Sequence, residues 1–180
     1  MPAYHHGDLR RALLDAAVTV IEQDGVSSLS LRDLARRVGV SHAAPAHHFG
    51  DKSGLLTALA VEGHRMQAAM LREAWERRTD FLDVGVAYVR FAVEHRAHFE
   101  VMYRPDLLDP DDEDLREARR AAGAFLYGPA GTIARDRHAA IAAWSLMHGI
   151  ATLWLTGNIP AGAGKDPEKL ARAAGRYLFR

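Results

Sequence analysis

The sequence contains no cysteine and carries no net charge, because 23 lysine and arginine residues balance 23 aspartate and glutamate residues. The absence of cysteine excludes disulfide bonds and thiolate metal sites, which fits a reducing compartment. The balanced charge excludes a global basic field, so contact with nucleic acid would depend on where individual charges lie. The first residues, MPAYHHGDLR, lack the apolar core of a secretory signal. We therefore expect a cytoplasmic protein.

The sequence also has few of the patterns on which enzymes depend. It has no glycine-rich phosphate loop and no His-Glu pair at zinc-ligand spacing on one helix. Ser145 and His148 lie one helical turn apart, but no third partner or oxyanion site accompanies them. His95 and His98 are too few to hold a metal. We therefore expect no catalytic residues, no metal site and no cofactor.

The segment from Ser30 to Lys52, SLRDLARRVGVSHAAPAHHFGDK, predicts two short helices joined by a tight turn. Ser30 is expected to cap the first helix with its hydroxyl, and Asp33 completes a capping-box pattern. Gly39 suits the left-handed position that ends a helix. The apolar face of this helix has the spacing i, i+3, i+4 and i+7, at Leu31, Leu34, Ala35 and Val38. The pattern is that of a helix-turn-helix.

The second helix, expected from about His42 to Phe49 with Ser41 as its cap, lacks a broad apolar face. It carries histidines among small alanines, as a recognition helix needs if its backbone is to approach base edges. Pro45 lies within it, where it removes one donor and could kink the last turn. An ordinary helical hairpin is the alternative, and the turn pattern alone does not exclude it.

The rest of the chain is predicted to be helical too, which gives an all-α fold. Asp51 and Asp80 are expected to begin helices, because an aspartate before a helix can accept from its unpaired N–H groups. Asp166-Pro167 is expected to begin another, because proline suits the first position of a helix. The expected helices cover residues from 7 or 8 to 23, 51–78, 80–98 with a continuation over 98–103 to a break at Pro105, 115–126 and 132–157, followed by a last helix that begins at Asp166-Pro167.

Three segments, HHGDLRRALLDAA, LSLRDLARRVGVS and HFGDKSGLLTAL, resemble the DNA-binding domain of the TetR family of transcriptional regulators. The pattern of Trp144, His148 and Gly149 is similar to a C-terminal domain type found in part of that family. The resemblance implies a helix-turn-helix DNA-binding domain over residues 1–50 and a helical ligand-binding and dimerisation domain over residues 51–180. It also implies a homodimer that binds an operator in double-stranded DNA, as a repressor released by a small molecule.

The DNA contacts expected from this resemblance lie in and around the second helix of the hairpin. Bases would be read by His42, Ala43, Ala44 and His47, and phosphates would be held by Ser30, Ser41 and Lys52. Arg32 and His48 are further expected DNA-binding residues. The sequence departs from the family where Ala46 replaces a frequent tyrosine and where His47 replaces a larger or more basic residue. The alternative is a helical binding protein or enzyme that keeps the hairpin only as a scaffold.

The stretch from Thr132 to Gly157 is apolar nearly all round, so it must be buried on most faces. A membrane span is the rival interpretation, but the run is barely long enough and is interrupted by Ser145, His148 and Thr152. We therefore expect no membrane span. Burial against a partner subunit is expected instead, with a four-helix contact that involves Ala140, Ala151, Leu155, Leu170, Ala174, Tyr177 and Leu178.

The body of the chain is also rich in aromatic and sulfur side chains. Any one of them could simply be part of the core, but together they come from helices that, by the resemblance, surround the regulator's ligand pocket. Such side chains suit an apolar or aromatic effector. The expected pocket residues are Met66, Met70, Tyr88, Phe91, Phe99, Met102, Trp144, Met147 and His148.

Overall fold

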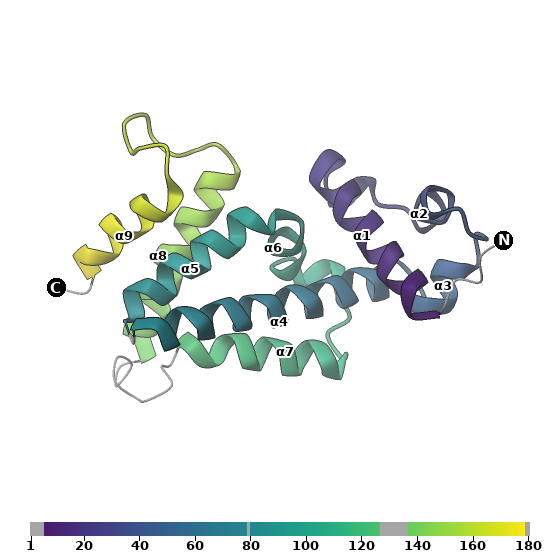
Figure 1. The fold of residues 1–180 in the computed structure, drawn as a ribbon, viewed down its shortest axis with the longest axis horizontal. Helices are drawn as coiled ribbons and strands as arrows, with labels where there is room; N and C mark the ends of the chain where they lie inside the picture. The colour runs from purple at the N-terminus through teal and green to yellow at the C-terminus, as the bar shows by residue number, and fades with distance from the viewer. Residues whose placement is uncertain (1–5, 79, 127–136, 179–180) are drawn as a thin grey trace. The chain divides into compact units, whose positions relative to one another are not determined.

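The computed structural model describes residues 6–78, 80–126 and 137–178. All regular secondary structure in these residues is helical, which confirms the predicted all-α fold (Figure 1). No helix in this part of the chain is long and apolar enough to cross a membrane. The elements are α1 (His6–Asp24), η1 (Val26–Ser28), α2 (Leu31–Val38), α3 (Ala44–Phe49), α4 (Lys52–Arg78), α5 (Phe81–Glu94), α6 (Arg96–Met102), η2 (Pro105–Leu107), α7 (Glu113–Gly123), η3 (Ala124–Leu126), α8 (Arg137–Leu155) and α9 (Pro167–Leu178), where η denotes a single 3-10 turn.

The chain folds into two compact units. Unit 1 consists of Met1–Gly63 together with Ala97–Arg116, and unit 2 consists of His64–Arg96 together with Glu117–Arg180. The first half of α4 therefore belongs to unit 1 and its second half to unit 2. Residues 127–136, where the start of the helix predicted over 132–157 falls, lie outside the described residues.

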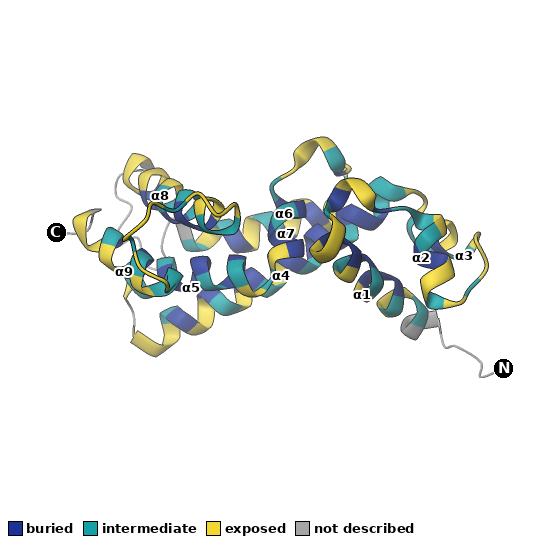
Figure 2. Cartoon of the chain, turned by 90° about the horizontal axis from the view of Figure 1, so that it is seen from above, coloured by how far each residue is buried: buried dark blue, intermediate teal, exposed yellow. Residues whose placement is uncertain are grey.

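The core of unit 1 is built from leucines of α1, α2 and α4. Leu13, Leu34, Leu55 and Leu59 are all fully buried. In Figure 2 these three helices each carry buried segments, drawn in dark blue. Burying each of these side chains contributes about 1.5–3 kcal/mol. Within the predicted apolar face of α2, Leu34 and Ala35 are buried and the two outer positions are half-buried. The predicted face of this helix therefore does point into the core.

A second part of unit 1 comes from a distant stretch of sequence, because residues 97–116 fold onto the first half of α4. Gly63 allows this close approach, since a Cβ atom there would overlap the Met102 side chain. The loop that follows α6 is held as well. The Ser53 hydroxyl donates to the Leu107 carbonyl at 3.1 Å, and the Asp109 N–H donates to the Thr57 hydroxyl at 2.9 Å.

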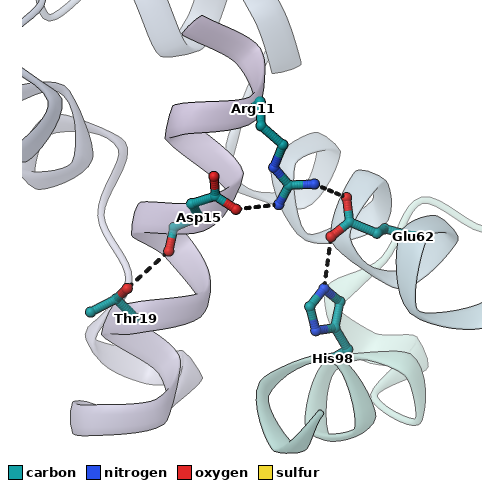
Figure 3. A network of polar contacts seen from close by, with 5 residues as sticks. All are labelled: Arg11, Asp15, Thr19, Glu62 and His98. Atoms are coloured by element: carbon teal, nitrogen blue, oxygen red, sulfur yellow. Dashed lines mark hydrogen bonds and ion pairs between the residues drawn. The ribbon is translucent and has the colours of Figure 1, made fainter. Parts of the chain in front are cut away.

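A polar network ties three helices of unit 1 together (Figure 3). Glu62 on α4 accepts from the Arg11 guanidinium on α1 and is bonded to His98 on α6, with 3.0 Å between His98 Nε2 and Glu62 Oε1. Arg11 also pairs with Asp15 at 2.6 Å. Burial alone would raise the pKa of Glu62, but the hydrogen bonds from Arg11 and His98 hold it below its usual value. Glu62 is therefore a carboxylate at neutral pH.

Unit 2 is centred on α5, α8 and α9. Met147 of α8 fits against two glycines, Gly85 on α5 and Gly175 on α9, each of which lacks the side chain that would collide with it. Ion pairs join α5 to α9 on the outside, between Asp83 and Arg172 and between Arg90 and Glu168. Two small residues and one flexible thioether thus permit close contact among the three helices.

The helix starts predicted at aspartates are confirmed. Asp51 accepts from the Gly54 N–H, Asp80 from the Leu82 N–H, and Asp166 from the N–H groups of the second and third residues of α9, all at 2.9–3.0 Å. The helix predicted from Asp80 to about His98 ends earlier than predicted. It stops at Glu94, because His95 leaves helical geometry with φ −124° and ψ 50°, and a new helix, α6, begins at Arg96.

Candidate functional site

The turn between α2 and α3 has the predicted geometry. Gly39 takes the left-handed conformation, with φ 76° and ψ 33°, and the Val40 N–H reaches back to the Ala35 carbonyl at 2.9 Å. This pairing satisfies carbonyl groups at the end of α2 and turns the chain sharply toward α3. The helix-turn-helix therefore depends on the conformation of one glycine.

We predict that Gly39→Ala lowers the free energy of unfolding by about 1 kcal/mol, because a side chain disfavours positive φ. Gly123→Ala is the matched control. Its site at the end of α7 has open space around it and no positive φ, so the substitution should be neutral or slightly stabilising. Urea denaturation of both variants measures the difference, and equal midpoints would contradict this account of the turn.

The predicted capping by Ser30 is only partly right. Ser30 occupies the position before α2 with an extended backbone, but its side chain makes no capping hydrogen bond. Asp33 pairs with Arg36 at 2.8 Å. The capping box predicted from the spacing of Ser30 and Asp33 is therefore wrong, because a basic residue one turn later takes the carboxylate.

The recognition helix begins later than the sequence predicted. It starts at Ala44 rather than at about His42, and Pro45 is buried in its first turn. A proline there costs no hydrogen bond, since the first N–H groups of a helix have no partner within it. Pro45 therefore removes no hydrogen bond from α3. Ser41 contributes its backbone carbonyl, which accepts from the Ala44 N–H at 3.1 Å, and no side chain caps this helix.

Most of the predicted base-reading residues are exposed. We define the recognition face as the exposed residues on α3 and the turn before it: His42, Ala43, Ala46 and His47. Ser41 is exposed beside this face, whereas Ala44 and His48 are half-buried. The face thus combines two imidazoles with small side chains, and a DNA backbone could approach it closely.

One support of the recognition helix had no signal in the sequence. The Arg10 guanidinium of α1 lies over the Phe49 ring at the end of α3, 5.3 Å from its centre. Such a cation–π contact contributes about 0.5–1 kcal/mol at an exposed site. It holds α3 against α1. The two residues lie far apart in sequence, so no local pattern could have predicted that they meet.

The basic residues of α2 differ in whether an ion pair within the protein already involves them, which decides whether they can bind phosphate without breaking that pair. Arg36 is occupied by Asp33, but Arg32 and Arg37 are exposed and form no ion pair within the described residues. Arg37 is thus an additional candidate that the sequence reasoning missed, although the i, i+3 spacing of Asp33 and Arg36 could have revealed it. The Lys52 ammonium lies 3.4 Å from the Ser27 carbonyl, so the predicted phosphate contact would require it to leave a weak hydrogen bond.

We predict that Arg37→Gln weakens DNA binding about equally on every sequence and lowers the slope of log affinity against log salt by about one. One phosphate contact releases about one counterion. Arg36→Gln, on the same helix, should change the slope less because Asp33 already neutralises Arg36. Fluorescence anisotropy at several salt concentrations gives both slopes. A larger change in slope for Arg36→Gln than for Arg37→Gln would mean that Arg36, and not Arg37, contacts the phosphate.

The predicted pocket residues do not all come together. Phe99 and Met102 belong to unit 1. Phe91 is fully buried against His95, with 5.2 Å between their rings, and Met147 fills the contact among α5, α8 and α9. Met66 and Met70 are half-buried on α4. The sulfur and aromatic side chains of unit 2 thus include core residues as well as half-buried ones.

Three of the predicted pocket residues form a hydrogen-bonded cluster that joins α5 to α8. The Tyr88 hydroxyl lies 2.8 Å from His148 Nδ1 and accepts from Trp144 Nε1 at 3.2 Å. Burial lowers the pKa of His148, so its ring is neutral at physiological pH. These polar groups satisfy one another, and the cluster stabilises the contact between the two helices.

Sequence reasoning missed a buried polar pair on α4, His64 and Gln67. Burial, with a smaller contribution from the positive charge of Arg119, lowers the pKa of His64 to about 4. In a long helix, two polar residues three positions apart look like part of a solvated face. Only the arrangement of the neighbouring helices makes them buried.

We predict that His64 makes the protein less stable as the pH falls from about 6.5 to about 4. The unfolded chain takes up a proton there before the folded chain does, so the stability present at neutral pH is lost on acidification. The full shift corresponds to about 3 kcal/mol. Urea denaturation at successive pH values should give a flatter profile for His64→Gln, and identical profiles would contradict the assignment.

The predicted dimer residues fall into two groups. Ala140 and Ala151 are buried within their own chain, so the surface of α8 that a partner could reach consists of other residues. Leu155, Leu170 and Ala174 are half-buried, Tyr177 is 76% exposed, and the side chain of Leu178 lies outside the described residues. Among the described residues of unit 2, the large apolar side chains most exposed are Ile141, Leu153 and Tyr177, all on α8 and α9.

A helix-turn-helix with an exposed second helix, carried by a chain whose regular secondary structure is all helical in the described residues, defines a helix-turn-helix DNA-binding protein. The family described as "Bacterial regulatory proteins, tetR family" matches residues 13–59, and "Tetracyclin repressor-like, C-terminal domain" matches residues 81–176. The chain belongs to the TetR family, and it is a DNA-binding transcriptional regulator.

The chain is also similar to individual proteins. The HTH-type transcriptional regulator BetI of Paraburkholderia phymatum is 36% identical over 80 residues, which cover 44% of this chain and only 37% of that protein. BetI of Ectopseudomonas mendocina is 28% identical across 99% of this chain and 96% of its own length. A solved structure of a protein of unknown function from Rhodococcus sp. RHA1 has a TM-score of 0.82 and 37% identity, covering 100% of this chain and 98% of that one.

Proposed function

We propose that the protein is a homodimeric repressor that binds a pseudo-palindromic operator through α3 and is released by a small apolar or aromatic effector. The observation that carries the proposal is the recognition face, where His42 and His47 stand exposed among alanines. Imidazole groups can donate or accept hydrogen bonds at base edges, and alanine methyl groups can contact thymine methyl groups.

The homodimer is supported by the surface of α8 and α9. Ile141 is 45% exposed, Leu153 is 44% exposed and Tyr177 is 76% exposed. Large apolar side chains gathered on adjacent helices favour association, and two-fold dimers are the commonest soluble oligomers. In such a dimer the two recognition helices would enter successive major grooves about 34–36 Å apart. The operator would then share the two-fold symmetry of the protein.

Release by an effector requires that the ligand bind the two conformations of the repressor differently. Unit 2 offers half-buried Met66, Met70 and Trp144 beside buried polar groups, and methionine adapts to irregular apolar shapes. Coupling is reciprocal: an effector that weakens operator binding tenfold must itself bind tenfold more weakly to the DNA complex, about 1.4 kcal/mol in each direction.

The test begins with genomic DNA fragments captured by the purified protein. A captured promoter is then transcribed in vitro with and without the protein. A repressor lowers the transcript from that promoter and leaves an uncaptured promoter unchanged. An increase in transcript would make the protein an activator. Failure to capture any sequence selectively would favour a helical binding protein or enzyme that keeps the hairpin only as a scaffold.

A further inference from the structure

The interior of unit 2 contains a side-chain amide whose hydrogen-bonding capacity is incompletely used. Gln67 on α4 is 2% exposed, and its Nε2 atom is buried without a hydrogen-bond partner among the described residues. Buried polar groups in folded proteins are almost always paired, because water is not there to replace a missing partner. An unpaired amide donor at this depth therefore indicates a missing acceptor.

The same region carries a positive charge that forms no ion pair among the described residues. Arg119 on α7 is half-buried and forms no ion pair within the described part of the chain. It lies close enough to His64 to help lower the pKa of that ring, and His64 lies one helical turn from Gln67 on the same face of α4. His64 is neutral at pH 7, so the guanidinium supplies the positive charge in this neighbourhood.

Two other residues of unit 2 with an incompletely paired polar group have an explanation that Gln67 lacks. Asp83 and Arg90 each have a buried atom without a hydrogen bond, but both side chains form ion pairs with α9. The predicted anchors Tyr88 and His148 are bonded to each other. Gln67 and Arg119 are therefore two groups whose polar atoms an additional molecule would satisfy.

We propose that Gln67 and Arg119 bind the polar end of the effector, and that this end is an anionic oxygen group such as a carboxylate or sulfonate on an apolar or aromatic body. The Gln67 amide donates to one oxygen and the Arg119 guanidinium neutralises the charge. Met70, one turn after Gln67, lies on the same side of α4 and can contact the apolar body. This inference rests on the proposed function, because it assigns the chemistry of the effector site in unit 2.

Two fluorescent probes with one ring system test the proposal. Anilinonaphthalene sulfonate carries the anionic group, and N-phenyl naphthylamine is the same aromatic body without it. The wild-type protein should bind one sulfonate probe per protomer, and more tightly than the uncharged probe. Gln67→Leu and Arg119→Gln should each weaken the sulfonate probe about tenfold, equal to about 1.4 kcal/mol, and change the uncharged probe less than about twofold.

Arg120→Gln is the matched control, because Arg120 lies next to Arg119 on α7 but is exposed. It should leave both probes unchanged. The proposal is overturned if the wild type shows no saturable binding of the sulfonate probe, if both probes respond alike to Gln67→Leu and Arg119→Gln, or if Arg120→Gln has the effect of Arg119→Gln. Circular dichroism of each variant verifies that the helices are intact.

Selective DNA binding, measured on the same preparations, distinguishes a failure of the anionic-effector proposal from a failure of the proposed function. If the wild-type protein binds DNA selectively but fails the probe test, the proposed DNA-binding function stands and the proposal of an anionic effector is refuted. Protein that fails to bind any DNA sequence selectively removes the proposed function itself, whatever the probes do.

Discussion

Leu153→Asp is expected to convert the dimer to monomers and to weaken operator binding about 100-fold or more. Leu153 is a large exposed side chain on α8, and in the proposed dimer it is covered by the partner. An aspartate would bring a carboxylate into that apolar contact from each subunit, which is costly without a partner for the charge. A monomer also loses the gain of holding two half-sites at once, which amounts to about 100-fold or more.

Sedimentation equilibrium measures the assembly, and anisotropy with an operator fragment measures the affinity. Ala121→Asp is the control, since it places the same charge on an exposed position of α7 and should leave both properties unchanged. A Leu153→Asp protein that remains a dimer with normal operator affinity would move the interface away from α8. A wild-type protein that is already monomeric at micromolar concentration would contradict the dimer.

His47→Ala is expected to weaken operator binding about 30-fold or more and to remove the preference for one base pair in each half-site. A good side-chain contact to a base edge discriminates by about 1–3 kcal/mol, and a two-fold operator contains that contact twice. Two contacts at the lower value give about 2 kcal/mol, or about 30-fold. His47 is exposed on α3, so its removal should leave the stability of the protein nearly unchanged.

The measurement is the affinity of wild type and variant for every single-base substitution in the operator. The wild type should discriminate at one position where the variant does not. Arg37→Gln serves as the comparison, because a phosphate contact lowers affinity on all sequences alike. If His47→Ala also lowers all affinities alike, His47 contacts the backbone and another residue reads the base.

Features that depend on neighbouring residues in the sequence could be predicted. The apolar face of α2, the left-handed Gly39 and the aspartates that begin α4, α5 and α9 each follow from local backbone or side-chain chemistry. The failures have physical causes as well. Asp33 had two possible partners within one turn, and it pairs with Arg36 instead of completing a box with Ser30. Pro45 fits the first turn of a helix, so α3 begins only at Ala44.

Features set by tertiary packing could not be predicted. The stretch 97–116 folds onto α4 because Gly63 allows close contact with α6, and no local pattern indicates this. The contact of Arg10 with Phe49 likewise joins distant segments. Ala140 and Ala151 were predicted to face a partner, but a helix that is apolar on most sides does not reveal which side the rest of its own chain covers. Gln67 looks like a surface residue until its neighbours are placed.

The central claim is that a two-fold dimer reads DNA through α3, and the DNA that the purified protein selects from a random pool tests it most directly. The account predicts an inverted repeat whose half-site centres are about 10–10.5 base pairs apart, or a multiple of that spacing. The same selection with His47→Ala should lose one position in each half of the repeat. A single unrepeated site, or a pool that shows no enriched sequence, would contradict the account.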